Sequence, residues 1–200
     1  LSYIVRQTED KINSLIYILG KVPGTAIVYV RNRKRTKEIA VLLQQAGISA
    51  DFFHAGLNRD DKNLRQSRWK NNECRVIVST NAFGMGIDKP DVRLVIHMDM
   101  PGSLEEYYQE AGRAGRDEQR AYAVALCSNI DCTKLKKRLA DEFPDRDFIS
   151  RVYDALGNYY QIAMGFGLDT VHDFSLVDFC TAYKFSHLQT HHALKILELA

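Results

Sequence analysis

The chain has 200 residues, of which 46% are hydrophobic and 26% charged, a composition typical of globular domains and not of disordered or fibrous chains. Its net charge is +2, and residues 146–200 hold four basic and six acidic side chains, which leaves a net +4 on residues 1–145. This is only a mild indication of a polyanionic partner. No apolar run reaches the roughly 18–20 residues of a membrane span, and we expect no membrane partner.

Cysteine and histidine spacings predict neither a disulfide framework nor a metal site. The four cysteines, none of them in a C-x2-C pair, are Cys74, Cys127, Cys132 and Cys180. We therefore expect no zinc, and unpaired cysteines suit a reducing compartment. His187 and His191 are four residues apart, but no Cys or acidic residue accompanies them in sequence, which favours a role without metal.

Apolar strands alternate with amphipathic helices along the first part of the chain. Thr25–Val30 is continuously apolar, which is typical of a strand buried on both faces of a parallel sheet. The remaining expected elements are helix 33–46, strand Ile48–Phe53, helix Arg59–Lys70, strands Arg75–Ser79 and Val92–His97, helix Leu104–Ala111 and strand Tyr122–Cys127. This order predicts an α/β fold with a parallel sheet flanked by helices, in which ligands gather at the carboxyl ends of the strands.

The pattern becomes helical after Ile130, and Pro144-Asp145 interrupts it. We expect helices at 131–143, 147–163, Phe174–Tyr183 and His187–Leu199, with domains 1–144 and 145–200. Three tyrosines in this segment could stack on bases, but their near-helical spacing favours the core; they are Tyr153, Tyr159 and Tyr160. The last helix could be a recognition helix, yet the segment's net negative charge favours packing through Leu188, Ala193, Leu194 and Leu197.

Two stretches carry the chemistry. Gln109–Asp117 sets Arg113 and Arg116 three residues apart, so helical geometry would direct both guanidiniums to one face, with glycines leaving that face bare. Arginine presents a fork of donors suited to phosphate oxygens. Thr80–Asp88 follows a strand with a hydroxyl, two glycines and a carboxylate, a pattern suited to phosphate and ribose, although a Gly-rich turn closed by Asp88 would look the same.

These stretches, together with Tyr29–Arg33 and Phe53–Leu57, resemble the second motor domain of RecQ-type superfamily 2 DNA helicases. The resemblance covers roughly residues 1–130 in order and spacing, and Ala82–Pro90 is its most RecQ-like part. It implies a RecA-like sheet and an ATP-dependent, 3′-to-5′ DNA helicase of DNA repair and recombination. It also implies the bacterial cytoplasm near the nucleoid, or the nucleus of a eukaryote.

The resemblance assigns roles to individual residues. Arg116 would be the arginine finger on the γ-phosphate of ATP, Arg113 its companion, and Gln109 a link from nucleotide to domain interface. Asp88, with the backbone near Gly86, would contact the ribose. The residues expected to hold single-stranded or duplex DNA through its phosphates are Arg33 and Thr80, with Asn32 and His54 as weaker candidates.

The chain departs from the family pattern in two ways. It has no G-x-x-x-x-G-K-[ST] loop and no acidic magnesium motif, so ATP and Mg²⁺ would be held mainly by a first motor domain in the same protein. We therefore expect this chain alone to be inactive, with Arg113 and Arg116 pointing at solvent. Residues 131–200 lack the family's zinc cysteines, so the segment is either a helical replacement or the start of a winged-helix domain.

Two alternatives keep the fold and change the function. A nucleic-acid-binding module could have retained the sheet and lost the motor, but the intact arginine pair disfavours this. An RNA helicase or another superfamily 2 translocase would keep the chemistry and change the substrate.

Overall fold

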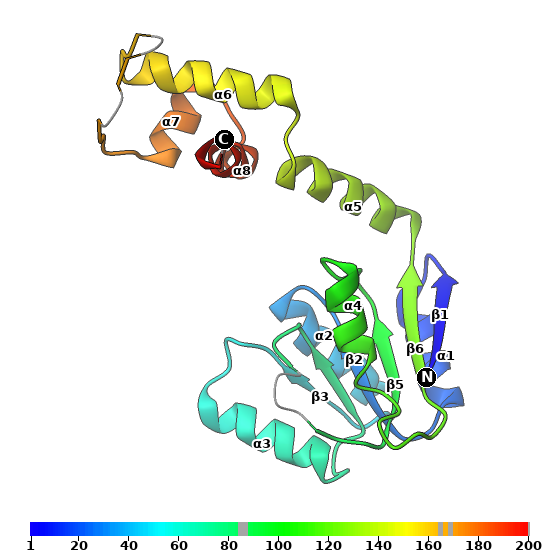
Figure 1. The fold of residues 1–200 in the computed structure, drawn as a ribbon. Helices are drawn as coiled ribbons and strands as arrows, with labels where there is room; N and C mark the ends of the chain where they lie inside the picture. Colours follow the sequence, from blue (N-terminus) through cyan, green and yellow to red (C-terminus); the bar gives the residue numbers. More distant parts are fainter. Residues whose placement is uncertain (84–87, 164–165, 168–169, 200) are drawn as a thin grey trace. The chain divides into compact units, whose positions relative to one another are not determined.

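A computed structural model describes residues 1–83, 88–163, 166–167 and 170–199 (Figure 1). Its contacts divide the chain into two compact units, Leu1–Asp131 and Cys132–Ala200. The division lies inside a helix and before Pro144, where the sequence predicts the domain boundary. The domain assignment 1–144 and 145–200 stays a prediction.

The first unit is built on a six-stranded sheet in which every pair of neighbouring strands is parallel. The strand order is β1-β6-β5-β2-β4-β3. The strands are β1 (Ser2–Gln7), β2 (Thr25–Tyr29), β3 (Ala50–Phe53), β4 (Val76–Ser79), β5 (Val92–His97) and β6 (Tyr122–Cys127). The predicted α/β fold with a parallel sheet is confirmed.

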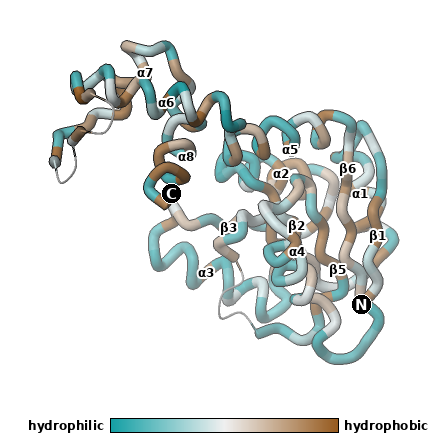
Figure 2. Tube along the Cα trace, turned by 45° about the horizontal axis from the view of Figure 1, so that its top comes forward, coloured by the Kyte–Doolittle hydropathy of each residue, from teal (hydrophilic) through white to brown (hydrophobic). Residues whose placement is uncertain are grey.

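Helices cover both faces of the sheet (Figure 1). On one face, Leu15 of α1 (Lys11–Lys21) and Leu43 of α2 (Arg33–Gln45) pack in one core with Val28 of β2. On the other face, Trp69 of α3 (Arg59–Lys70) packs in a second core with Ile27 of β2, and α4 (Leu104–Ala111) lies on this side. Burial from both sides explains why β2 is continuously apolar, as the brown centre of the sheet in Figure 2 illustrates.

The second unit is helical. Its core is formed by residues of α6 (Arg146–Tyr159), α7 (Leu176–Tyr183) and α8 (His187–Glu198). A further helix, α5 (Asn129–Glu142), begins in the first unit and continues into the second. The predicted helix 147–163 ends early, at Tyr159, because the chain turns at Tyr160 and Gln161. The φ of Gln161 is 53°, which is left-handed and incompatible with a continued helix.

The side chains of the helical unit follow the predicted packing only in part. Ala193 is buried as predicted, whereas Leu188 on the same helix is 50% exposed. Tyr159 packs edge-on against Phe179, with ring centroids 5.5 Å apart. The predicted core position of Tyr153 is wrong, because this side chain is 57% exposed. Among the described residues, no helix is both long and apolar enough to cross a bilayer.

Candidate functional site

Arg113 and Arg116 lie in a turn beyond the end of a helix and not on the helix itself. α4 begins at its N-cap Ser103, whose hydroxyl accepts from the Glu106 amide at 3.1 Å, and ends at Ala111. Beyond it, the Gly115 amide donates to the Val92 carbonyl at 2.9 Å, and Gly115 has φ of 70°. The expectation of a helical face kept bare for a ligand is therefore wrong.

The two glycines instead serve the chain's own turn. A Cβ on Gly112 would lie 2.9 Å from the Tyr108 carbonyl oxygen, and one on Gly115 would lie 3.0 Å from the Ala121 Cβ. The left-handed φ of Gly115 also disfavours any side chain there.

The turn sends the two arginines to different surroundings. Arg116 is exposed, and its Nη1 lies 3.0 Å from Oδ1 of Asp88, whose side chain is 84% exposed. Arg113 is half-buried, and its guanidinium interacts with the Tyr29 hydroxyl. The expectation that both arginines point at solvent is correct for Arg116 and wrong for Arg113, because the turn at Gly112 brings Arg113 back toward the sheet.

The other predicted nucleotide residues can be located in part. Gln109 is exposed on the last turn of α4, one helical turn before Arg113. Asp88 and Arg116 are brought together although they are far apart in sequence. Gly86 lies outside the described residues. The roles of all these residues stay predictions.

The predicted DNA contacts follow three adjacent strands. Asn32 and Arg33 follow β2, His54 follows β3 and Thr80 follows β4, so all four lie at the carboxyl edge of the sheet. The side chain of Asn32 accepts from the Lys34 amide at 2.8 Å and caps α2, so its oxygen is already engaged. Thr80 is only 7% exposed.

Arg33 and His54 converge on Gly56. A Cβ on Gly56 would lie 3.2 Å from Nη1 of Arg33 and 3.3 Å from Nδ1 of His54. Burial lowers the pKa of His54, and the positive charges of Arg33 and Lys62 lower it further, so the imidazole is neutral at pH 7. Its buried Nδ1 has no hydrogen-bond partner in the described part of the chain.

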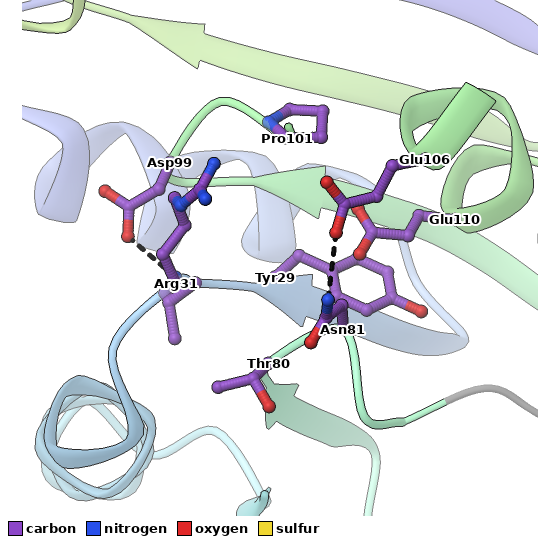
Figure 3. A pocket seen from close by; sticks show the side chains of 9 residues that line it. Tyr29, Arg31, Thr80, Asn81, Asp99, Pro101, Glu106 and Glu110 are labelled. Atoms are coloured by element: carbon purple, nitrogen blue, oxygen red, sulfur yellow. Dashed lines mark hydrogen bonds between the residues drawn. The ribbon is translucent and has the colours of Figure 1, made fainter. Parts of the chain in front are cut away.

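A polar pocket lies beside these residues at the ends of β2, β4 and β5 (Figure 3). Its volume is about 90 Å³, and Thr80 is the single predicted site residue in its lining. The Asn81 amide donates to Glu106 of α4 at 3.0 Å, and Asp99 accepts from the Arg31 amide at 3.0 Å. The remaining lining residues are Tyr29, Val30, Pro101 and Glu110.

The lining carboxylates were missed because each looks like an ordinary surface residue in sequence. Glu106 and Glu110 are four residues apart on α4, which places them on one helix face. Asp99 follows β5 as Thr80 follows β4. Their common position at strand ends and on one helix face was the available signal.

Comparison with known proteins decides which kind of domain holds these residues. The helicase conserved C-terminal domain matches residues 10–118, more than half of the chain. The chain belongs to this helicase domain family. The match contains both Thr80–Asp88 and the whole arginine run, Gln109–Asp117.

The family's relatives confirm the resemblance to RecQ-type helicases. The ATP-dependent DNA helicase Q1 of Pongo abelii is 46% identical over 130 residues, which are 62% of this chain and 20% of that protein. The ATP-dependent DNA helicase RecQ of Pasteurella multocida is 39% identical over 145 residues, 72% of this chain and 23% of that protein. The chain thus spans about a fifth of the length of these two relatives.

A solved structure confirms the RecA-like helicase fold. The E. coli DEAD-box protein SrmB, in its crystal structure with the regulator of ribonuclease activity A, superposes with a TM-score of 0.59 at 28% identity. The superposition covers 68% of this chain and 84% of the SrmB chain.

Proposed function

We propose that this helicase domain is the second motor domain of an ATP-dependent DNA helicase that moves from 3′ to 5′ along DNA in repair and recombination. It closes one side of a site whose other side, a first motor domain, holds most of the ATP and Mg²⁺. Arg116 and Arg113 contribute positive charge at the γ-phosphate, and Asp88 contacts the ribose. Such an arginine contributes about 10³–10⁵ in rate to phosphoryl transfer.

The observation that carries the proposal is the contact between Arg116 and Asp88. It joins the segment after β4 to the turn after α4, the two stretches expected to contact phosphate and ribose. Both side chains are exposed, at 39% and 84%. An exposed ion pair contributes only about 0–1 kcal/mol, so the Arg116 guanidinium can leave Asp88 for a phosphate at little cost.

The DNA side of the proposal rests on the carboxyl edge of the sheet. Arg33 and His54 converge there, and Thr80 follows the adjacent strand. Contacts of this kind hold phosphates without recognising bases, which suits a motor that steps along any sequence. Closing and opening of the cleft between the two motor domains would couple ATP turnover to movement along the strand.

Substitution of Arg116 in the full-length protein tests the nucleotide role. We expect Arg116→Ala to reduce DNA-stimulated ATP hydrolysis at least about 10³-fold, while the dissociation constant for ATP changes little, because the finger acts on the transition state. Arg120→Ala is the matched control, since Arg120 is exposed nearby and packs over the Tyr122 ring. Hydrolysis at the wild-type rate in Arg116→Ala would refute the assignment.

The substrate is tested by strand separation with the same full-length protein. We expect unwinding of DNA duplexes with a 3′ single-stranded tail and no unwinding of matched RNA duplexes. Unwinding of RNA alone would replace the DNA proposal with an RNA helicase. The 200-residue chain by itself should hydrolyse no ATP, because it lacks the phosphate-binding loop.

A further inference from the structure

A buried tyrosine stands between the two stretches that carry the proposed nucleotide contacts. Tyr29 ends β2 and His97 ends β5, and the two residues are direct partners in the parallel pairing of these strands. Their rings stack with centroids 5.5 Å apart and planes inclined by 20°. Tyr29 is 3% exposed and His97 is fully buried, so the position of both rings is fixed by packing.

The hydroxyl of Tyr29 connects two segments that are distant in sequence. It donates to the Phe83 carbonyl oxygen at 2.9 Å and accepts from the Arg113 guanidinium. Burial raises the pKa of Tyr29 far above its usual value, and the nearby Arg113 offsets part of this rise while Glu110 adds to it. The hydroxyl therefore keeps its proton at neutral pH and makes both hydrogen bonds at once.

A carboxylate lies close to Tyr29. Glu110, on the last turn of α4, is 7% exposed, and its Oε2 lies 2.9 Å from Nε2 of His97. Figure 3 shows the Glu110 carboxylate beside the Tyr29 ring. His97 thus holds the Glu110 carboxylate close to Tyr29, whose hydroxyl also contacts Arg113. We call Tyr29, Phe83, His97, Glu110 and Arg113 the Tyr29 network.

We propose that Tyr29 is a positioning residue for Arg113, with the His97–Glu110 pair as its support. Phe83 immediately precedes the segment that leads to Asp88, and Asp88 pairs with Arg116. One hydroxyl therefore fixes Arg113 relative to both the strand β2 and the segment after β4. The inference rests on the proposed function, since it assigns Tyr29 a role only through the arginine that contacts nucleotide.

The isosteric change Tyr29→Phe tests this in the full-length protein. It keeps the stacked ring and removes the hydroxyl that holds both Phe83 and Arg113. We expect kcat for DNA-stimulated ATP hydrolysis to fall about 10-fold, the equivalent of one hydrogen bond to a charged group, while KM for ATP changes less than about twofold. Tyr107→Phe is the matched control, because the Tyr107 ring also packs against His97, at 5.0 Å, but its hydroxyl is not part of the network.

A double-substitution cycle separates positioning from general loss of structure. Arg113→Lys keeps a charge and a measurable rate but cannot replace the guanidinium fork. If Tyr29 acts through Arg113, Tyr29→Phe should lower kcat no further in the Arg113→Lys background. A kcat that falls by the product of the two single effects would overturn the proposal, as would a wild-type kcat in Tyr29→Phe.

A second variant keeps the proposal testable if Tyr29→Phe unfolds. Glu110→Gln retains an oxygen for His97 and removes the negative charge close to Tyr29, the residue that holds Arg113. We therefore expect kcat to fall again without a change in KM, and an unchanged kcat would overturn the support role. The two proposals fail in different ways. Normal hydrolysis in both Arg116→Ala and Arg113→Lys would refute the proposed function itself. Impaired ATP hydrolysis in Arg113→Lys together with normal hydrolysis in Tyr29→Phe would refute only the positioning role of Tyr29.

Discussion

Alanine at three glycines of the first unit separates backbone strain from steric contact. Gly115 has φ of 70° and space for no side chain, since its Cβ would lie 3.0 Å from the Ala121 Cβ and 3.2 Å from the Gln119 carbonyl oxygen. Gly47 has φ of 77° but nothing within 4 Å of its Cβ position. Gly20 lies within α1, also with nothing within 4 Å, and φ there is not left-handed.

The expected free energies of unfolding follow from these geometries. A left-handed backbone costs a non-glycine residue about 1–2 kcal/mol, so Gly47→Ala should destabilise by that amount. Gly115→Ala adds an overpacked contact of about 1–3 kcal/mol, for a total near 3 kcal/mol. Gly20→Ala should stabilise by about 0.5–1 kcal/mol, because alanine is the better helix former.

Denaturant titration of the 200-residue chain, followed by tryptophan fluorescence, measures the free energy of unfolding of all three glycine variants. Trp69 is the single tryptophan, is fully buried on α3 and donates to the Ala26 carbonyl at 3.2 Å, so its emission reports on the first unit. If Gly115→Ala were no more destabilising than Gly47→Ala, the contact with Ala121 would not constrain the arginine turn. If Gly20→Ala and Gly47→Ala lowered the free energy of unfolding equally, the role assigned to the left-handed φ of Gly47 would be refuted.

Two further predictions concern the carboxyl edge of the sheet. Asn32→Ala should lower the free energy of unfolding by about 1 kcal/mol through loss of the α2 cap, whereas Asn32→Asp should preserve stability and weaken DNA binding if Asn32 also faces phosphate. Denaturation and fluorescence-anisotropy binding measure the two effects separately. Because the pKa of folded His54 is lowered from 6.5, the unfolded chain binds the proton first as pH falls. The stabilising contribution is therefore full above about pH 6.5 and declines below it, so the free energy of unfolding of the wild type should fall relative to His54→Gln between pH 7 and 5. Parallel curves would contradict the lowered pKa.

The sheet was predictable wherever burial imposed a pattern. Thr25–Tyr29 is an uninterrupted run of β-branched and apolar residues because helices cover both faces of the sheet, and its bounds were predicted within a residue. Val92–His97 is buried except at the half-buried Arg93, and it was predicted with the observed bounds. β1 was missed because all six of its residues are exposed at the sheet edge, and its apolar run, Tyr3–Val5, is too short to mark a strand by itself. α1 carried a usable signal: Asp10 caps it, and Leu15, Ile18 and Leu19 bury one face.

Site residues were predictable where their chemistry is unusual in sequence. Gly-Arg repeats and glycines after a strand stand out, so Asp88 and Arg116 were both predicted as nucleotide contacts from the sequence. The structure adds that the two side chains contact each other. Glu110 and His97 do not stand out, because a glutamate in a helix and a histidine in a strand are ordinary. Their importance comes from a contact of 2.9 Å that depends on the packing of α4 against β5.

The arginine pair shows how equal spacing in sequence can hide unequal roles. A separation of three residues fits a helix face as well as a turn, and the end of α4 at Ala111, followed by the positive φ of Gly115, makes it a turn here. In the turn, Arg116 reaches the exposed Asp88, while the half-buried Arg113 contacts the Tyr29 hydroxyl. An exposed guanidinium can exchange partners at little cost, whereas a half-buried one is held by the groups around it. Arg116 is therefore suited to exchange Asp88 for a ligand, whereas Arg113 is suited to stay in place and fix the turn that carries Arg116.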